Sequence, residues 1–194
     1  TDSGVHARGM VAAFRTGKGI PVRAFSDGLN SLLPRDIAIR EAIEAEEGFN
    51  PRSDAVGKHY RYTILNTPRR SPLNRYFVWQ MPVKLDLQAM RQAAEYFVGE
   101  KDFSAFRASN CGAGTTVRRI DSVALSYADD FIRIDVKGSG FLKNMVRIMV
   151  GTLVGVGQGA FDPDSIPSLI LSGDRKKTGI TAPPQGLSLI EVFY

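Results

Sequence analysis

The order of strand and helix signals in the second part of the chain constrains the fold more than any other feature. These signals are a strand at 75–81 (RYFVWQM), a helix from Asp86 to Gly99, strands at 117–127 and 131–137, a helix at 141–156 and a strand at 187–193. The central strands are joined by Ala-Asp-Asp, which is typical of tight turns. The order β-α-β-β-α-β is that of the ferredoxin-like unit, so we predict an α+β fold with a mixed, mainly antiparallel sheet.

The first seventy residues contain only the later part of such a pattern. They hold a strand signal at 9–16, a helix signal at 21–33, an alternating segment at 36–45 and a strictly alternating strand at 58–66. A preceding strand, helix and strand would complete a second copy and place Asp2 in the loop of its central hairpin. We therefore predict an incomplete half-domain at 1–70, a complete one at 71–194, a cleft between them, and a longer parent protein.

Composition narrows the classes of partner and compartment. The net charge of +5 favours a polyanionic partner such as RNA, although many basic proteins are simply solvated. Cys111 is the only cysteine, which excludes an internal disulfide and favours a reducing compartment, the cytoplasm. His6 and His59 lie far apart in the sequence without a cysteine pair, so we predict no metal site. No apolar run of membrane-spanning length and no secretory leader occurs, so we predict no membrane partner.

Two charged residues stand out as candidates for chemistry. Asp2 lies in a glycine-containing turn (TDSGVHARG), where a carboxylate is most often a turn-former bonded to its own backbone. Arg147 lies in an otherwise apolar helix (FLKNMVR), where an arginine needs a carboxylate partner or an outlet to the surface. The residues alone leave both alternatives open at both positions.

Tyrosines and cations supply a second set of candidates. Tyr60 and Tyr62 share one face of their predicted strand, where they either pack in the core or stack on unpaired bases. Basic residues that could hold phosphates accompany these motifs, although each could equally be a solvated surface charge: Arg8, Arg52, Lys58, Arg61 and Arg107.

Six short motifs occur in order along the whole chain. They are TDSGVHA at 1–7, FNPR at 49–52, KHYRY at 58–62, DFSAFR at 102–107, FLKNMVRIMVG at 141–151 and GLSLIEV at 186–192. Each motif is weak alone, but the ordered set is specific, and with it the chain resembles the tRNA pseudouridine synthase A family.

This resemblance implies a pseudouridine synthase fold of two ferredoxin-like (RRM-like) half-domains around a central cleft. It implies a tRNA pseudouridine synthase that isomerises uridines on the 3′ side of the anticodon stem-loop, without a cofactor and as a homodimer. In that family the essential aspartate corresponds to Asp2, the tyrosine that stacks on the target base to Tyr60, the basic partner of the aspartate to Arg147, and an apolar pocket residue to Leu187. Arg8, Arg52, Lys58 and Arg107 are the expected contacts to the tRNA.

The chain departs from the family pattern at its start. The family motif normally begins Gly-Arg-Thr-Asp, whereas this sequence opens on Thr1 and lacks the early strand, helix and strand of the first half-domain. We therefore expect an N-terminally truncated chain in which Asp2 is displaced or disordered and activity is impaired.

Two other functional classes compete with the synthase. A non-catalytic RNA-binding module would use the ferredoxin-like sheet as a stacking platform and would explain the charge and the tyrosines. A carboxylate-based hydrolase would need a second acid near Asp2, and the nearest candidates, Asp27 and Asp54, are predicted to lie in loops. A direct ion pair between Asp2 and Arg147 would favour the synthase, and separated, solvated side chains would favour the binding module.

Overall fold

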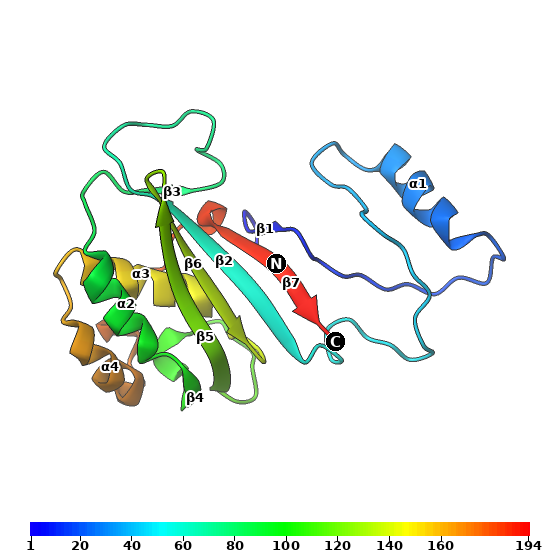
Figure 1. The fold of residues 1–194 in the computed structure, drawn as a ribbon. Coiled ribbons are helices and arrows are strands. Elements are labelled where there is room, and N and C mark those ends of the chain that lie inside the picture. Colours follow the sequence, from blue (N-terminus) through cyan, green and yellow to red (C-terminus); the bar gives the residue numbers. More distant parts are fainter. The chain divides into compact units, whose positions relative to one another are not determined.

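The computed structural model describes residues 1–194 and forms two compact units, Thr1–Met10 with Ala55–Tyr194, and Val11–Asp54. The larger unit is built on a seven-stranded sheet with the order β1-β7-β2-β6-β5-β4, and β3 pairs with β2 (Figure 1). The strands are β1 (His6–Ala7), β2 (Gly57–Leu65), β3 (Trp79–Gln80), β4 (Gly99–Asp102), β5 (Val117–Ala128), β6 (Phe131–Gly138) and β7 (Leu187–Phe193). The α-helices of this unit are α2 (Leu87–Glu95), α3 (Met145–Gly157) and α4 (Ile166–Ser172).

The predicted mixed, mainly antiparallel α+β sheet is confirmed. β2 pairs antiparallel with both β6 and β7, and β5 pairs antiparallel with β4 and β6, whereas β1 and β3 each add a short parallel pairing. The hairpin between β5 and β6 turns at Asp129 and Asp130, whose φ angles of 51° and 65° match the left-handed turn that suits a two-residue hairpin. β4 escaped prediction because it is only four residues long and almost entirely polar apart from Gly99.

The first strand of the ferredoxin-like unit is β2 and not the predicted strand at 75–81. β2 lies between β7 and β6 and is hydrogen-bonded to both along most of its length, so it belongs to the same sheet as the later elements. The segment 75–81 contributes only β3, beside the end of β2. The compact units divide after Met10 and after Asp54, and the division into half-domains at residue 70 stays a prediction.

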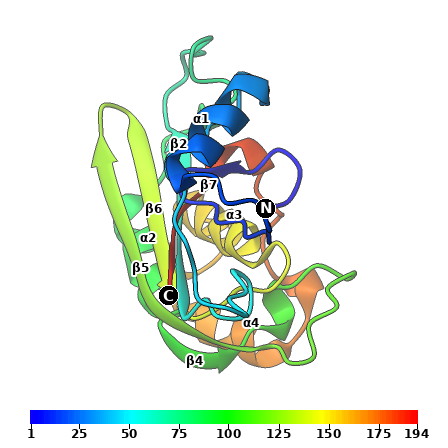
Figure 2. The same ribbon diagram turned by 90° about the vertical axis from the view of Figure 1, so that its right-hand side faces the viewer.

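The core lies between one face of the sheet and the helices α2, α3 and α4 (Figure 1). Alternate residues of β2 and β6 point into it, including the fully buried Tyr62, Ile64 and Ile134. The predicted apolar helix at 141–156 is α3, which is buried on nearly every side as it crosses this face (Figure 2). Asp86 caps α2 by accepting hydrogen bonds from the backbone N–H groups of Gln88 and Ala89, which confirms the predicted helix start.

The smaller unit, Val11–Asp54, contains one regular element, α1 (Val22–Leu32), at the predicted position. The predicted strand at 9–16 is absent, the alternating segment at 36–45 forms no strand either, and no residue of this unit is buried. The backbone N–H and C=O of Ile39 bond instead to the side chain of Asn30, at 2.7 and 2.8 Å. A strand needs a neighbouring strand to satisfy its backbone, and this unit contains none.

Candidate active site

Asp2 lies in the turn that leads into β1. The backbone N–H of Val5 donates to the carbonyl of Asp2 at 3.1 Å, and Gly4 has a φ of +79°, a conformation that favours glycine. β1 then pairs with β7, with His6 opposite Ser188. The turn is held beside β7 by these contacts, while the Asp2 side chain remains exposed to solvent.

Tyr60 is the predicted partner that the structure brings to Asp2. It lies on β2, partly buried, with its ring edge-on to that of Phe141 at a centroid distance of 5.2 Å. Burial raises the pKa of the Tyr60 hydroxyl, and the negative charge of Asp2 raises it further. The two side chains are therefore electrostatically coupled, and Tyr60 is a neutral phenol at neutral pH.

Arg147 lies in the first turns of α3 and does not pair with Asp2. Its Nε donates to the carbonyl of Ala182 at 2.7 Å and its Nη1 to Oδ1 of Asn144 at 3.0 Å. The backbone N–H of Ala182 in turn donates to the Arg147 carbonyl at 3.1 Å. None of the four ion pairs in the chain includes either residue, so the predicted Asp2–Arg147 pair is absent. Arg147 instead directs its Nε and Nη1 donors to neutral oxygen acceptors close to it on α3 and in the segment at Ala182.

The segment 178–187, which we call the wall segment, runs along α3 and ends in β7. Gly151 and Gly186 permit its close approach: an added Cβ on Gly151 would lie 1.8 Å from the Ile180 carbonyl oxygen, and one on Gly186 would lie 2.5 Å from the Tyr62 ring. The Tyr62 hydroxyl donates to the Pro183 carbonyl at 2.7 Å. Burial raises the pKa of Tyr62 well above its usual range, against a smaller opposite effect of Arg147.

Leu187, the predicted pocket residue, is the last residue of the wall segment. It is 6% exposed and lies opposite Tyr62 in the pairing of β7 with β2, while Leu189 lies opposite Tyr60. Gly151 and Gly186 were not predicted as site residues. A glycine inside an apolar helix and another just before a predicted strand were the available signals.

The predicted basic contacts are spread over several elements. Lys58 lies on β2, two residues before Tyr60 and therefore on the same face. Arg107 follows a short 3-10 helix, in a loop whose Ala108 N–H donates to the Lys143 carbonyl at 3.0 Å, next to the start of α3. Arg8 follows β1, and its backbone N–H donates to Leu189 at 2.7 Å. Arg52 belongs to the smaller unit, where its backbone N–H bonds to Asn50.

The opposite face of the sheet carries a separate ionic cluster. His59 Nε2 and Arg61 Nε both donate to Oδ1 of Asp135, at 2.6 and 2.9 Å. Arg61 therefore pairs with the Asp135 carboxylate of the neighbouring strand β6 and lies on the face away from Tyr60. No group of three potential His, Cys, Asp or Glu ligands gathers anywhere in the chain.

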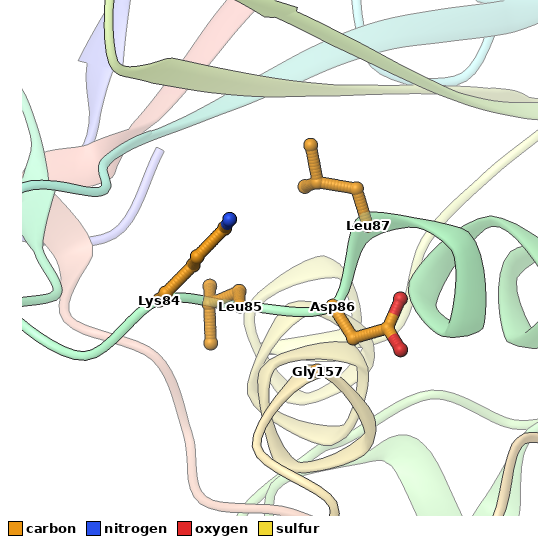
Figure 3. A pocket seen from close by; sticks show the side chains of 5 residues that line it. All are labelled: Lys84, Leu85, Asp86, Leu87 and Gly157. Carbon is orange, nitrogen blue, oxygen red and sulfur yellow. The ribbon is translucent and has the colours of Figure 1, made fainter.

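A surface depression of about 470 Å³ lies at the start of α2, away from the predicted site residues. It is lined by Lys84, Leu85, Asp86, Leu87 and Gly157 (Figure 3). Its one carboxylate, Asp86, is already used to cap α2. We therefore place the candidate site at Asp2 and Tyr60.

No helix of the chain combines the length and apolar character that crossing a bilayer requires.

Comparison with known proteins assigns the sequence to one family. A family model described as tRNA pseudouridine synthase matches residues 93–194. Curated proteins named tRNA pseudouridine synthase A align with the whole chain and with 80% of their own length: those of Geotalea uraniireducens, Geobacter sulfurreducens and Acetivibrio thermocellus are 64%, 57% and 49% identical. The chain therefore belongs to the tRNA pseudouridine synthase A family.

Proposed function

We propose that this chain isomerises uridine to pseudouridine in tRNA, with Asp2 as the essential carboxylate. The observation that carries the proposal is the strand register: Leu189 of β7 lies opposite both Ala7 of β1 and Tyr60 of β2, which brings the Asp2 turn and the partly buried Tyr60 ring to the same part of the sheet. The charge of Asp2 acts on the Tyr60 hydroxyl. The names of the curated relatives describe the same activity.

The reaction explains why a carboxylate and an aromatic ring are needed together. The bond between N1 and C1′ breaks, the base turns, and C5 joins C1′, while C5 loses a proton and N1 gains one. Nothing is oxidised or reduced, so the chemistry needs no cofactor. Asp2 can act as a nucleophile at the sugar or as a base that opens an elimination path, and both roles need its carboxylate next to the sugar.

Tyr60 supplies a stacking surface for the extruded base. Extrusion costs a few kcal/mol, which stacking on an aromatic ring partly offsets. Because the pKa of Tyr60 is raised, its hydroxyl is a hydrogen-bond donor and a poor acceptor for the proton on C5. We therefore assign Tyr60 to binding the base, and assign proton removal to another acceptor.

Arg147 and Leu187 act through the wall of the site. Arg147 holds Ala182 against α3, and the wall segment then places Leu187 beside Tyr62. Arg147 is in this proposal a positioning residue, and its charge adds to that of the basic residues around the site.

The finer parts of the proposal concern the partner and its setting. Lys58, Arg107, Arg8 and Arg52 contact phosphates of the tRNA, which gives affinity without base specificity. The target uridines lie in the anticodon stem-loop, and the enzyme works as a homodimer in the cytoplasm. The family resemblance and the basic net charge support these parts.

One observation favours the non-catalytic RNA-binding module as a second candidate. Asp2 is exposed and makes no ion pair with Arg147, which is the arrangement expected of a chain that binds RNA without reacting with it. Both candidates predict tRNA binding, and only the synthase predicts turnover.

The test is tritium release from tRNA labelled at C5 of uridine. Asp2→Asn should lower turnover by roughly 10³-fold or more, because the variant loses the reacting carboxylate, while the Kd for tRNA changes only a few-fold. Glu100→Gln removes an exposed carboxylate on β4 and serves as the matched control, with turnover as in the wild type. Substantial turnover by Asp2→Asn would remove Asp2 from its role. A wild-type chain that binds tRNA without releasing tritium would favour the binding module.

A further inference from the structure

A cationic loop connects β2 to β3 and stands out from the end of the sheet (Figure 1). This loop, residues 67–77, is called here the arginine loop. It contains Arg69, Arg70 and Arg75. The sequence has no acidic residue between Asp54 and Asp86. Its exposed tip also carries Leu73, Tyr76 and Phe77, which are 88%, 61% and 57% exposed.

The arginine loop is shaped by its own hydrogen bonds. Gln80 Nε2 donates to the carbonyls of Thr67 and Arg69, at 3.2 and 2.7 Å. Arg75 donates to the Pro72 carbonyl and lies over the Tyr76 ring, 4.2 Å from its centroid. Two prolines, Pro68 and Pro72, restrict the backbone further. A loop organised before binding loses less conformational entropy when a partner binds.

The arginine loop contacts the segment that carries Asp2. His6 Nε2 donates to the Tyr76 carbonyl at 2.7 Å, and the His6 ring lies 4.8 Å from that of Phe77, tilted by 31°. His6 is four residues after Asp2 and is held in β1 against Ser188. A substrate bound at Asp2 therefore has the arginine loop as a neighbour.

We propose that the arginine loop is an RNA-contact surface that binds tRNA beside the reacting nucleotide. Arg69 and Arg70 have exposed side chains that form no hydrogen bond or ion pair with the chain, so they are available to phosphates. Tyr76 offers an exposed ring, and planar guanidinium groups beside aromatic rings suit the phosphates and bases of RNA. This inference rests on the proposed function, because it takes tRNA as the substrate.

The first experiment measures the Kd for tRNA as a function of salt. Arg69→Ala/Arg70→Ala should weaken binding about tenfold or more near physiological salt, and should lower the slope of log affinity against log salt by about 1.4 to 1.8, for two lost phosphate contacts. Lys84→Ala/Arg91→Ala is the matched control, since it removes two exposed cations at α2. Its Kd should stay within about twofold of the wild type, because it makes no phosphate contact in this proposal. Equal losses in both variants would show that only net charge matters, which would overturn the proposal.

A second measurement separates this proposal from the proposed function. At saturating tRNA, Arg69→Ala/Arg70→Ala should keep the wild-type kcat and raise KM, whereas Asp2→Asn should lose kcat and keep its Kd. An unchanged Kd for tRNA in the arginine variant overturns the RNA surface even if the wild type is fully active, and leaves an acidic protein as the partner of this loop. If the wild type releases no tritium, the proposed function fails, and the Kd comparison still decides the role of the loop.

Discussion

Asp2 and Arg147 lie in regions that are held in very different ways. Arg147 belongs to a buried helix, and the wall segment beside it is held by reciprocal bonds with Ala182 and by the Tyr62 hydroxyl. Asp2 belongs to an exposed turn held by one backbone bond to Val5 and by the two-residue strand β1. The candidate reactive carboxylate is thus on a lightly held segment, while the wall segment that its turn approaches at Pro184 is firmly packed.

This contrast implies that stability and activity respond to different substitutions. Segments with few buried contacts contribute little to the free energy of unfolding, and functional groups are often found on them. Changes in the wall should therefore lower stability and activity together. Changes in the Asp2 turn should lower activity with little change in stability.

The largest effect on stability is expected from Gly151→Ala. The added Cβ would meet the Ile180 carbonyl at 1.8 Å, so the wall segment must move away from α3. We expect a loss of about 3 kcal/mol or more, measured by urea denaturation, with loss of tritium release. Gly112→Ala, where nothing lies within 4 Å, is the control and should be nearly neutral. A wild-type stability for Gly151→Ala would show that the wall is not tightly packed.

Arg147→Ala should cost about 2–3 kcal/mol, because two bonds from a charged group are lost and Ala182 is released. Arg147→Lys keeps the charge but not the two-donor geometry, so it should recover only part of this loss. Combined with Asp2→Asn, the effects on stability should add within about 0.5 kcal/mol, since the two residues do not touch. A coupling above about 1 kcal/mol would instead indicate a direct ion pair in solution.

Gly4→Ala tests the turn on the other side of the comparison. The substitution strains a φ of +79° and brings the new Cβ to 3.0 Å from Cγ of Pro184. We expect a stability loss of about 1 kcal/mol and a fall in kcat of about tenfold, because small misplacements of a reacting group are costly. Pro184→Ala removes the atom that the new Cβ meets and should partly restore kcat in the double variant. Equal kcat values for wild type and Gly4→Ala would show that the turn does not position Asp2.

The smallest effect is expected from Tyr62→Phe, about 1 kcal/mol at neutral pH for one lost hydrogen bond. Burial raises the pKa of both Tyr60 and Tyr62, so their contribution to stability is complete below the unfolded pKa of about 10 and is lost as pH rises through the folded pKa. Tyr62→Phe should therefore lose less stability than the wild type between about pH 9 and pH 11, measured as urea midpoints. Gly112→Ala removes no ionisable group and should keep the wild-type slope.

Local patterns predicted the packed part of the fold well. The alternation at 58–66 and the apolar run at 141–156 correspond to β2 and α3, because each burial pattern repeats within a few residues. The same kind of alternation at 36–45 produced no strand, since a strand also needs a partner for its backbone. The segment 75–81 was likewise predicted to be the first strand of the ferredoxin-like unit, and β2 occupies that position in the sheet.

The sequence by itself determined the family, through six ordered motifs, and the candidates Asp2 and Tyr60 within it. Only the tertiary structure decided what Arg147 binds and which strand opens the half-domain. The physical reason is that motifs record residue types, whereas a guanidinium group binds the oxygen atoms within its reach, and here these belong to Ala182 and Asn144. The same holds for the arginine loop, whose position beside Asp2 depends on the contact of His6 with Tyr76 across 70 residues of chain.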